Sequence, residues 1–358
     1  MNKTQLVTFT PTDAFFFGGE TTFGSGDSRN FYAASNAFPQ QTTLVGVLRH
    51  ALFEAGYPNN IGQSFIANGT ANFGYLENIS PVFIYHQPTG NFAIPVSLPY
   101  SEEAEKEIPT AVGHLDNIQV NFGKTWQPAP VVTDYKEKHG MHSKLLFSEG
   151  DDPLKDFDEV FEEMTKTGIA RDRKAHTTIS GMFYQQKLFK LKTGYAFGSF
   201  VTGTTELFTA IQGRNMPMGG EKKNFVLQTK AVQQSLDTLF YTAVSKHCVK
   251  DNHPWVLLTS DAYVSPDIYD HCHLAISDTK PFRNIITPDS QYYSYSAALA
   301  KEKHNKLRYK SKQFTLLKRG TVLFPKKGQL TTITKELEKN VNFDTIGYNH
   351  YFTNPKTV

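Results

Sequence analysis

Short segments rich in aromatic and β-branched residues, each bounded by Gly, Pro or Asn, recur along this chain and limit the folds open to it. Such residues favour strands, and frequent turn residues keep those strands short. We predict strands at Leu6–Pro11, Pro81–Tyr85, Phe92–Leu98, Thr178–Tyr184, Lys187–Lys192, Tyr195–Val201, Asn224–Thr229, Trp255–Ser260, Gln313–Leu317 and Thr321–Phe324. Because they do not alternate regularly with helices, the sequence predicts an α+β fold.

Three segments have the apolar spacing of a helix. They are Thr43–Ala55, the acidic stretch Glu149–Glu163, and Ser235–His247. A chain of 358 residues exceeds what one hydrophobic core usually supports. We therefore predict two domains, residues 1–150 and 151–358, that divide near the second helix.

The overall charge and hydropathy exclude few functions. The formal net charge is only +3, so an argument for nucleic-acid binding has to rest on local clusters of cations. No stretch approaches the roughly 20 apolar residues that span a bilayer. We expect a soluble, cytoplasmic protein that has no membrane partner.

The two cysteines, Cys248 and Cys272, have four histidines near them. These are His247, His253, His271 and His273. Their spacing fits no closed structural zinc site, and along a strand His271 and His273 would face away from Cys272. We therefore interpret them as scattered surface histidines, and we predict no metal and no other cofactor.

Two segments concentrate positive charge. Residues 165–192 carry seven Lys and Arg against one acid, Asp172, and they read as a β-hairpin with a basic tip at Arg171–His176. Such a tip can grip phosphates, and Phe183, Tyr184 and Phe189 on the flanking strands could stack on unpaired bases. The alternatives are a solvated loop and core aromatic residues. Lys301–Lys327 is a second basic stretch, equally compatible with an ordinary soluble surface.

Two further places could seat an anion. The helix that begins after Phe38–Thr43 presents free backbone amides at its N-terminus, where the helix dipole favours a phosphate. Gly219-Gly220-Glu221-Lys222-Lys223 would let a backbone approach a phosphate closely. The alternatives are a capped core helix and a simple turn, and the spacing of a P-loop is missing.

No catalytic motif is visible, so we predict no catalytic residue. We find no nucleophile elbow, metalloprotease helix or dinucleotide fingerprint. His50 or His176 could in principle act as a general base in RNA cleavage. A metal-independent endoribonuclease is therefore the main alternative to a binding protein, and an assembly scaffold with no RNA contact is the third possibility.

Four motifs, in order along nearly the whole chain, resemble the third-subunit family of the Cmr complex, within the RAMP superfamily of CRISPR proteins. The first joins Asp13–Gly19 to Phe38–Arg49, an aromatic loop and a Phe-Pro-rich helix start. The others are Gly168–Arg173 with Gly181–Tyr184, then Met218–Lys222, and finally Gly320–Phe324 with Ile346–Tyr348. Lys222 and Asn349 stand where the family usually has a small residue and a second glycine.

The resemblance implies two ferredoxin-like, RRM-like RAMP domains with long insertions, the second including the basic β-hairpin 165–192. It implies a non-catalytic subunit that caps the five-prime repeat-derived handle of the guide RNA in antiviral defence, with the target RNA contacted indirectly. The implied protein partners are the large polymerase-like or cyclase-like subunit and the first backbone RAMP subunit. The RNA-binding residues it suggests are Gln40, Gln41, Thr42, Thr43, Arg49, His50, Arg171, Arg173, Lys174, His176, Gly219, Gly220, Lys222, Lys223, Tyr348 and Asn349.

Overall fold

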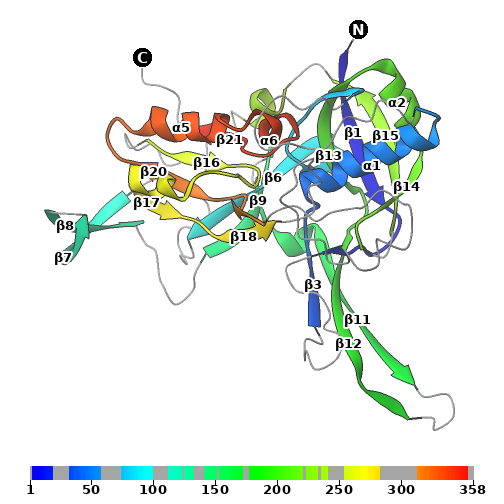
Figure 1. Cartoon of the computed structure of the whole chain (residues 1–358), viewed down its shortest axis with the longest axis horizontal. Helices are drawn as coiled ribbons and strands as arrows, with labels where there is room; N and C mark the ends of the chain where they lie inside the picture. The colour runs from blue at the N-terminus through cyan, green and yellow to red at the C-terminus, as the bar shows by residue number, and fades with distance from the viewer. Residues whose placement is uncertain are drawn as a thin grey trace, which may run out of the picture.

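The computed structural model has a mixed α+β fold, mostly strands in several sheets with few helices (Figure 1). It describes residues 2–18, 32–57, 74–99, 112–122, 125–132, 141–150, 153–171, 177–220, 223–232, 235–240, 254–282 and 313–353. The predicted α+β class is therefore confirmed. None of the helices in these ranges is long and apolar enough to cross a membrane.

The largest sheet is antiparallel throughout, in the order β10-β9-β6-β5-β13-β1-β15-β14, with β4 also paired to β13. Its strands are β1 Lys3–Pro11, β4 Leu76–Ile79, β5 Phe83–His86, β6 Asn91–Pro99, β9 Met141–Phe147, β10 Leu154–Asp156, β13 Tyr195–Gly203, β14 Asn215–Met218 and β15 Lys223–Ala231. The sheet crosses the predicted boundary at residue 150, because β13 and β15 flank β1. The last strand of this sheet along the chain, β15, ends at Ala231.

Helices α1 (Gln41–Glu54) and α2 (Thr205–Ile211) cover one face of the large sheet (Figure 1). The helix predicted at Thr43–Ala55 is confirmed, because its apolar stripe packs on that face. Strand β1 is buried on both of its faces from Leu6 to Phe9. Val7 and Phe9 face the helices, while Leu6 joins the core on the opposite side.

That opposite side packs against a second, four-stranded sheet in the order β17-β20-β16-β21. Its strands are β16 Val256–Leu258, β17 Cys272–Ile276, β20 Val322–Pro325 and β21 Tyr351–Thr353. Trp255, Leu257 and Phe324 meet Phe83 and Phe200 of the large sheet in one apolar cluster. Helix α5 (Leu330–Glu338) covers the outer face of the second sheet. The molecule is thus two sheets packed together with helices outside them.

The same chain path occurs twice. In the large sheet β1, α1, β4 with β5, β13, α2 and β15 follow one another, and β13 and β15 flank β1. In the second sheet β16, the 3-10 helix η4 (Pro266–His271), β17, β20, α5 and β21 follow one another, and β20 and β21 flank β16. We call each of these two strand-and-helix sets a unit. Across the sheet of each unit, the strands lie in the order second, third, first, fourth, counted along the chain.

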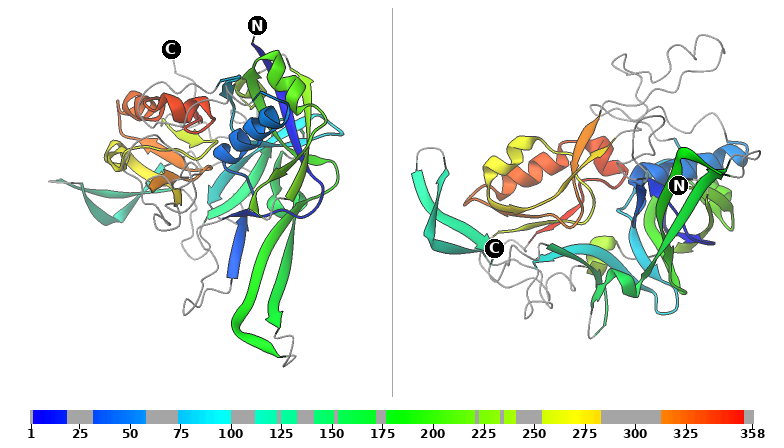
Figure 2. Two further views of the ribbon diagram at one scale, coloured as in Figure 1. Left: turned by 45° about the vertical axis from the view of Figure 1, so that its right-hand side comes forward. Right: turned by 90° about the horizontal axis from the view of Figure 1, so that it is seen from below.

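A long β-hairpin, which we call the arm, projects from the body (Figures 1 and 2). It consists of β11 (Phe161–Arg171) and β12 (Thr178–Leu191), with β3 (Tyr32–Asn36) parallel to the inner part of β12 and β2 (Phe17–Gly18) beside β3. The side chains from residue 162 to 167 are all exposed. The predicted hairpin at 165–192 is therefore present, and it begins earlier, at Phe161.

The helix predicted within Glu149–Glu163 is wrong. Residues 154–156 form β10, residues 157–159 form the 3-10 helix η2, and β11 starts at Phe161. Leu154, Val160 and Phe161 are buried from these different elements. Leu154 packs in the cluster between the two sheets, while Val160 and Phe161 pack in the cluster beneath α1. Their spacing imitates that of a helix, although a strand, a turn and a second strand carry them.

The remaining elements lie beside the second sheet or away from the body. Strand β18 (Thr279–Phe282) pairs with β19 (Phe314–Leu317), and α6 (Val341–Thr345) leads to the loop 346–349. A second hairpin, β7 (Val112–Phe122) with β8 (Thr125–Val132), extends on the side away from the arm (Figure 1). Of the helix predicted at Ser235–His247, residues 236–240 are helical and residues 241–247 lie outside the described residues.

Loop 346–349 joins the two units at a point where only glycine fits. Gly347 has a φ of +83°, and a Cβ on it would lie 2.7 Å from the Ile79 carbonyl oxygen and would collide with the Gln41 amide. We predict that Gly347→Ala lowers the free energy of unfolding by about 2–4 kcal/mol, from left-handed strain plus overpacking. Urea denaturation measures it.

Gly328→Ala is the matched control, because Gly328 has a φ of +79° and none of the described residues comes within 4 Å of the added Cβ. It should cost only the strain, about 1 kcal/mol. Equal losses for the two variants would show that the loop contact does not stabilise the chain.

Candidate nucleic-acid interface

Helix α1 begins without an acidic first turn and without a side-chain cap on Gln40. Its first amides are therefore electropositive, as the sequence predicts. However, Gln41 is completely buried there. Its Nε2 donates to the Ser80 carbonyl at 2.9 Å and to the Ile346 carbonyl at 2.8 Å, and its Oε1 accepts from the Val82 amide at 3.0 Å. The Gln41 side chain ties the large sheet to loop 346–349.

Loop 346–349 covers the start of α1. The Tyr348 side chain is completely buried, and burial raises its pKa although the neighbouring polar groups of Thr42 oppose the shift. Asn349 has a φ of +61° and is buried. Its Oδ1 accepts from the Tyr263 amide at 2.7 Å, and its Nδ2 donates to the Leu337 carbonyl at 2.7 Å.

The structure thus brings two predicted sites together, the helix start and the terminal glycine-rich loop. The side chains of Gln41, Tyr348 and Asn349 face protein and have no exposed surface for RNA, so their role in this fold is structural. Gln40, Thr42 and Thr43 remain partly exposed at the same place. The sequence analysis did not predict this contact, and it did not show which of these side chains are buried.

Arg49 and His50 lie farther along α1. Eight residues separate Arg49 from Gln41, which is about 12 Å of helix. Arg49 is partly buried, and burial lowers the pKa of its guanidinium. His50 is exposed and its Nε2 lies 3.2 Å from Glu54 Oε1. These two residues therefore do not share the mouth of the helix.

The glycine pair 219–220 packs closely on the loop before β2. The Gly220 amide donates to the Phe16 carbonyl at 2.7 Å. A Cβ on Gly219, which has a φ of +76°, would lie 2.6 Å from that same oxygen. Close backbone packing therefore explains both glycines. Lys223 starts β15 opposite Met218, and Lys222 lies outside the described residues.

Charge is graded along the arm. Glu162 and Glu163 lie near the body, where Glu163 pairs with Lys187 at 2.6 Å, while Lys166 and Arg171 lie farther out on β11. The predicted tip residues Arg173, Lys174 and His176 lie outside the described residues. The arm thus places its basic outer end away from the body, while its acidic residues Glu162 and Glu163 lie near the body.

A pocket that the sequence analysis did not identify lies beside the approach to α1. We call it the Arg319 pocket. Its volume is about 200 Å³, and its polar or aromatic lining includes Asn36, Phe38, Asp261, Lys280, Lys318 and Arg319. The guanidinium of Arg319 lies 4.9 Å from the centre of the Phe38 ring. Lys318 and Arg319 belong to the predicted basic stretch, but Lys280 comes from an unremarkable segment.

A buried carboxylate organises this pocket. Asp261 is 1% exposed, contacts Lys280, and accepts from the Arg319 amide at 3.0 Å. Burial alone would raise the pKa of Asp261, but the charges of Arg319 and Lys280 outweigh it and lower that pKa. Burial also lowers the pKa of Lys280, against the attraction of Asp261. At the rim, Lys318 pairs with Asp278 at 2.5 Å.

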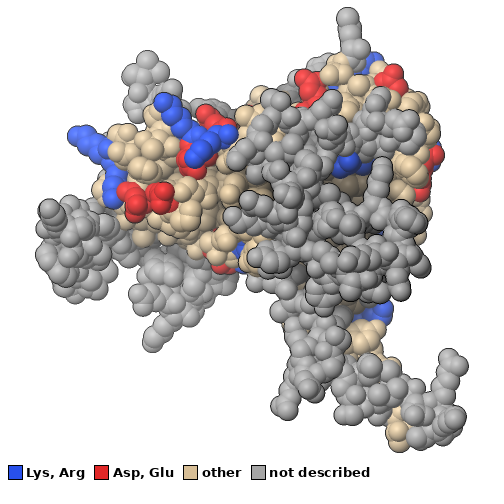
Figure 3. Space-filling view, in the orientation of Figure 1, with Lys and Arg blue, Asp and Glu red and all other residues tan. Residues whose placement is uncertain are grey.

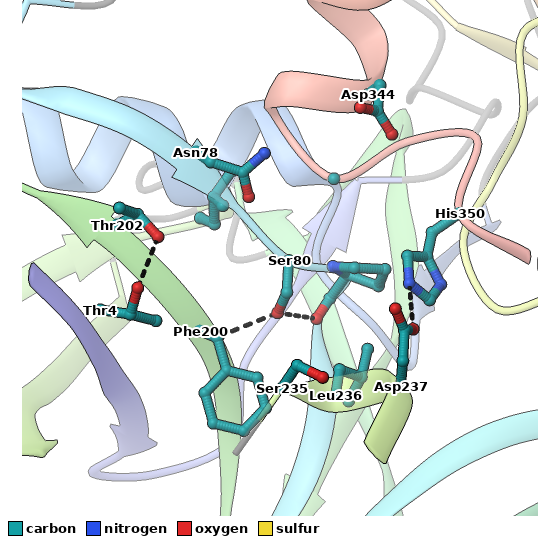
Figure 4. Close-up of a pocket in the computed structure, with 13 residues that line it drawn as sticks. Thr4, Asn78, Ser80, Phe200, Thr202, Ser235, Leu236, Asp237, Asp344 and His350 are labelled. Carbon is teal, nitrogen blue, oxygen red and sulfur yellow. Dashed lines mark hydrogen bonds and ion pairs between the residues drawn. The ribbon is translucent and has the colours of Figure 1, made fainter. Parts of the chain in front are cut away.

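A second pocket, of about 310 Å³, lies where β1, β4 and β13 meet the segment 344–350 (Figure 4). His350 joins the second unit to the segment before it, because its Nε2 lies 2.9 Å from Asp237 Oδ1, while its Nδ1 lies 2.6 Å from the Thr259 hydroxyl of its own unit. The bond to His350 lowers the pKa of Asp237. This lining has carboxylates, hydroxyls and one imidazole, but no Lys or Arg, so it is less suited to phosphate than the Arg319 pocket.

The described residues contain no cluster of three or more His, Cys, Asp or Glu able to hold a metal ion. Cys272 is buried, which raises its pKa to about 12, and its thiol donates to the Ile268 carbonyl at 3.4 Å. Cys248, His247 and His253 lie outside the described residues. Figure 3 shows Lys or Arg side chains next to Asp or Glu side chains in the region of α5. Lys339, at the end of that helix, pairs with Glu336 at 3.3 Å.

Comparison with known proteins gives the family. The model of the family described as CRISPR-associated protein (Cas_Cmr3) matches residues 7–355. The chain belongs to the Cas_Cmr3 family. The resemblance to this group of CRISPR proteins, inferred from four short motifs, is therefore confirmed. No curated protein sequence matches the chain.

Two solved structures share the fold of this Cas_Cmr3 chain. One is a chain of the type III-B Cmr-beta complex bound to cognate target RNA, with a TM-score of 0.54, 13% identity, and coverage of 97% of this chain and 96% of that one. The other is from the same complex bound to cognate target RNA and AMPPnP in state 1, with a TM-score of 0.53, 14% identity and the same coverage. At this identity the likeness concerns the fold alone.

The role of Gln41 can be tested separately from RNA binding. Gln41→Met would leave the Val82 amide and the Ser80 and Ile346 carbonyls without their partner, so we expect the free energy of unfolding to fall by about 3 kcal/mol. Urea denaturation without RNA measures this loss. His50→Ala on the exposed side of the same helix should change stability by less than about 1 kcal/mol. A stable Gln41→Met protein that has lost RNA binding would contradict the structural role.

Proposed function

We propose that this Cas_Cmr3 chain is a non-catalytic RNA-binding subunit of a type III-B CRISPR effector complex. In this role it caps the five-prime, repeat-derived handle of the guide RNA in antiviral defence. The observation that carries the proposal is the family match over residues 7–355. The similar chains in Cmr-beta structures bound to cognate target RNA support it.

The topology supports two ferredoxin-like RAMP units. That motif runs strand, helix, strand, strand, helix, strand. Both units follow this path with the strand order second, third, first, fourth, although the first helical position of the second unit holds the 3-10 helix η4. The units correspond to residues 3–231 and 256–353, and the arm is an insertion between the second and third strands of the first unit.

Two features support contact with single-stranded RNA. The arm carries basic residues outward from an acidic base, and the Arg319 pocket places three cations beside Phe38 and the start of α1. Phosphate contacts position an RNA chain, while loops and ends offer unstacked bases. The large polymerase-like or cyclase-like subunit and the first backbone RAMP subunit would be the neighbours, with the target RNA contacted through the guide.

Charge reversal on the arm tests the RNA contact. We expect the double variant Arg171→Glu, Arg173→Glu to retain at least tenfold less guide RNA on purification from cells that express the complex, because repulsion replaces two phosphate contacts. The variant Lys335→Glu, Lys339→Glu makes the same charge change on α5 and should retain RNA normally. If the arm variant keeps its RNA but loses its protein partners, the chain is a scaffold.

The absence of catalysis is tested by incubating the purified chain, alone and in complex, with guide precursor and with target RNA in a metal chelator. We expect both RNAs to stay intact on a denaturing gel, and His176→Ala to behave like the natural chain. Cleavage that disappears in His176→Ala would identify a RAMP endoribonuclease instead.

A further inference from the structure

We propose that the Arg319 pocket binds one phosphodiester group of single-stranded RNA. The inference rests on the proposed RNA-binding function and names the side chains that would perform part of it. Arg319 and Lys318 would contact the phosphate, while Lys280, Asp261 and Phe38 would hold Arg319 in place. None of these five belongs to the RNA-binding set predicted from the sequence.

The hydrogen-bonding state of Arg319 favours an acceptor. Its side chain is 11% exposed, and its Nη1 is buried without a hydrogen-bond partner among the described residues. Its Nε lies 3.6 Å from Asp261 Oδ1, longer than a hydrogen bond. Buried donors in folded proteins are nearly always paired. A guanidinium with unused donors that lines an open pocket therefore suits a ligand rich in acceptor oxygens.

The charges around the pocket match a monoanion. Three cations, Lys280, Lys318 and Arg319, stand against two carboxylates, Asp261 and Asp278, so the local balance is +3 − 2 = +1. The single negative charge of Asp261 is shared between Lys280 and Arg319, so it cannot cancel the positive charge of both. A phosphodiester carries one negative charge and only acceptor oxygens, which guanidinium and ammonium groups bind well.

The guanidinium is already oriented. The Phe38 ring lies against it at 4.9 Å, and Asp261 anchors the same residue through its backbone amide. Holding an arginine in place before binding lowers the entropy lost on contact. Lys318 is different, because its side chain is 44% exposed and, among the residues that the structure describes, its ion pair is with the exposed carboxylate of Asp278. It can leave that weak pair for a phosphate.

The position of the pocket agrees with a path of RNA past the start of α1. Asn36 and Phe38 line it directly before Gln40 and the first turn of the helix. Loop 346–349 fills the mouth of α1 itself, as described above. We therefore expect the anion predicted at the start of α1 to bind instead beside Asn36 and Phe38, just before the helix, where it would contact Arg319.

The test uses the full chain and a synthetic copy of the RNA that co-purifies with it. Lys318→Met and Arg319→Lys are compared with Lys339→Met, a matched control because Lys339 is also an exposed lysine beside one carboxylate, Glu336. We expect dissociation constants 3- to 10-fold higher for the first two variants and unchanged for the control. The slope of log affinity against log salt should fall by about 0.7 for Lys318→Met, the value for one phosphate of a single strand.

A second measurement identifies the group that is bound. Copies of the RNA with a single neutral methylphosphonate at each position in turn should include one that weakens binding to the natural chain but not to Lys318→Met. If the natural chain binds this RNA and both pocket variants bind it equally well, the inference is wrong while the proposed function stands. If the natural chain neither retains nor binds the RNA, the proposed function fails.

A carboxylate of a partner protein would satisfy the same charges. If so, the pocket variants would bind RNA normally and would lose association with a partner subunit in nuclease-treated samples. That result would overturn the phosphate assignment. Because Lys318 is exposed and its pair is weak, Lys318→Met should fold even if Arg319→Lys does not, and thermal unfolding of each variant checks this.

Discussion

The antiparallel pairing of β1 with β13 and β15 is the contact on which the rest of the structure depends. It joins residues 3–11 to residues 195–231 and therefore closes a loop of nearly two hundred residues. Once β1 is central, its two faces fix the layers, with α1 and α2 on one side and the second sheet on the other. The arm starts from this framework, because β12 leads directly into β13.

Local patterns in the sequence predicted strands rich in aromatic and β-branched residues, such as Tyr195–Val201, and the amphipathic helix α1. They failed where apolar residues at helical spacing belong to different elements, as at Leu154, Val160 and Phe161. In a related way, the largest sheet takes strands from both sides of the predicted boundary at residue 150. Strand pairing is a long-range property, and neither composition nor spacing indicates that β13 lies between β5 and β1.

At the candidate site too, features within one segment could be predicted, whereas contacts between distant segments could not. The motifs included both the start of α1 and loop 346–349, but only the structure shows that the two meet, where Gln41 Nε2 donates to the Ile346 carbonyl. Residue type did not reveal that Gln41 and Asn349 point inward, because an amide serves a buried backbone as well as a ligand. The Arg319 pocket was missed because Asp261, Lys280 and Arg319 are far apart in the sequence and meet only after folding.

The two units share one order of strands and helices, and this indicates where extra residues can be inserted. In the first unit the insertion bearing the arm lies between β5 and β13, and in the second unit β18, β19 and their connection lie between β17 and β20. Both additions occupy the turn between the second and third strands. Lengthening a surface turn costs little entropy, so this turn is the place where either half can acquire new peptide without disturbing its sheet.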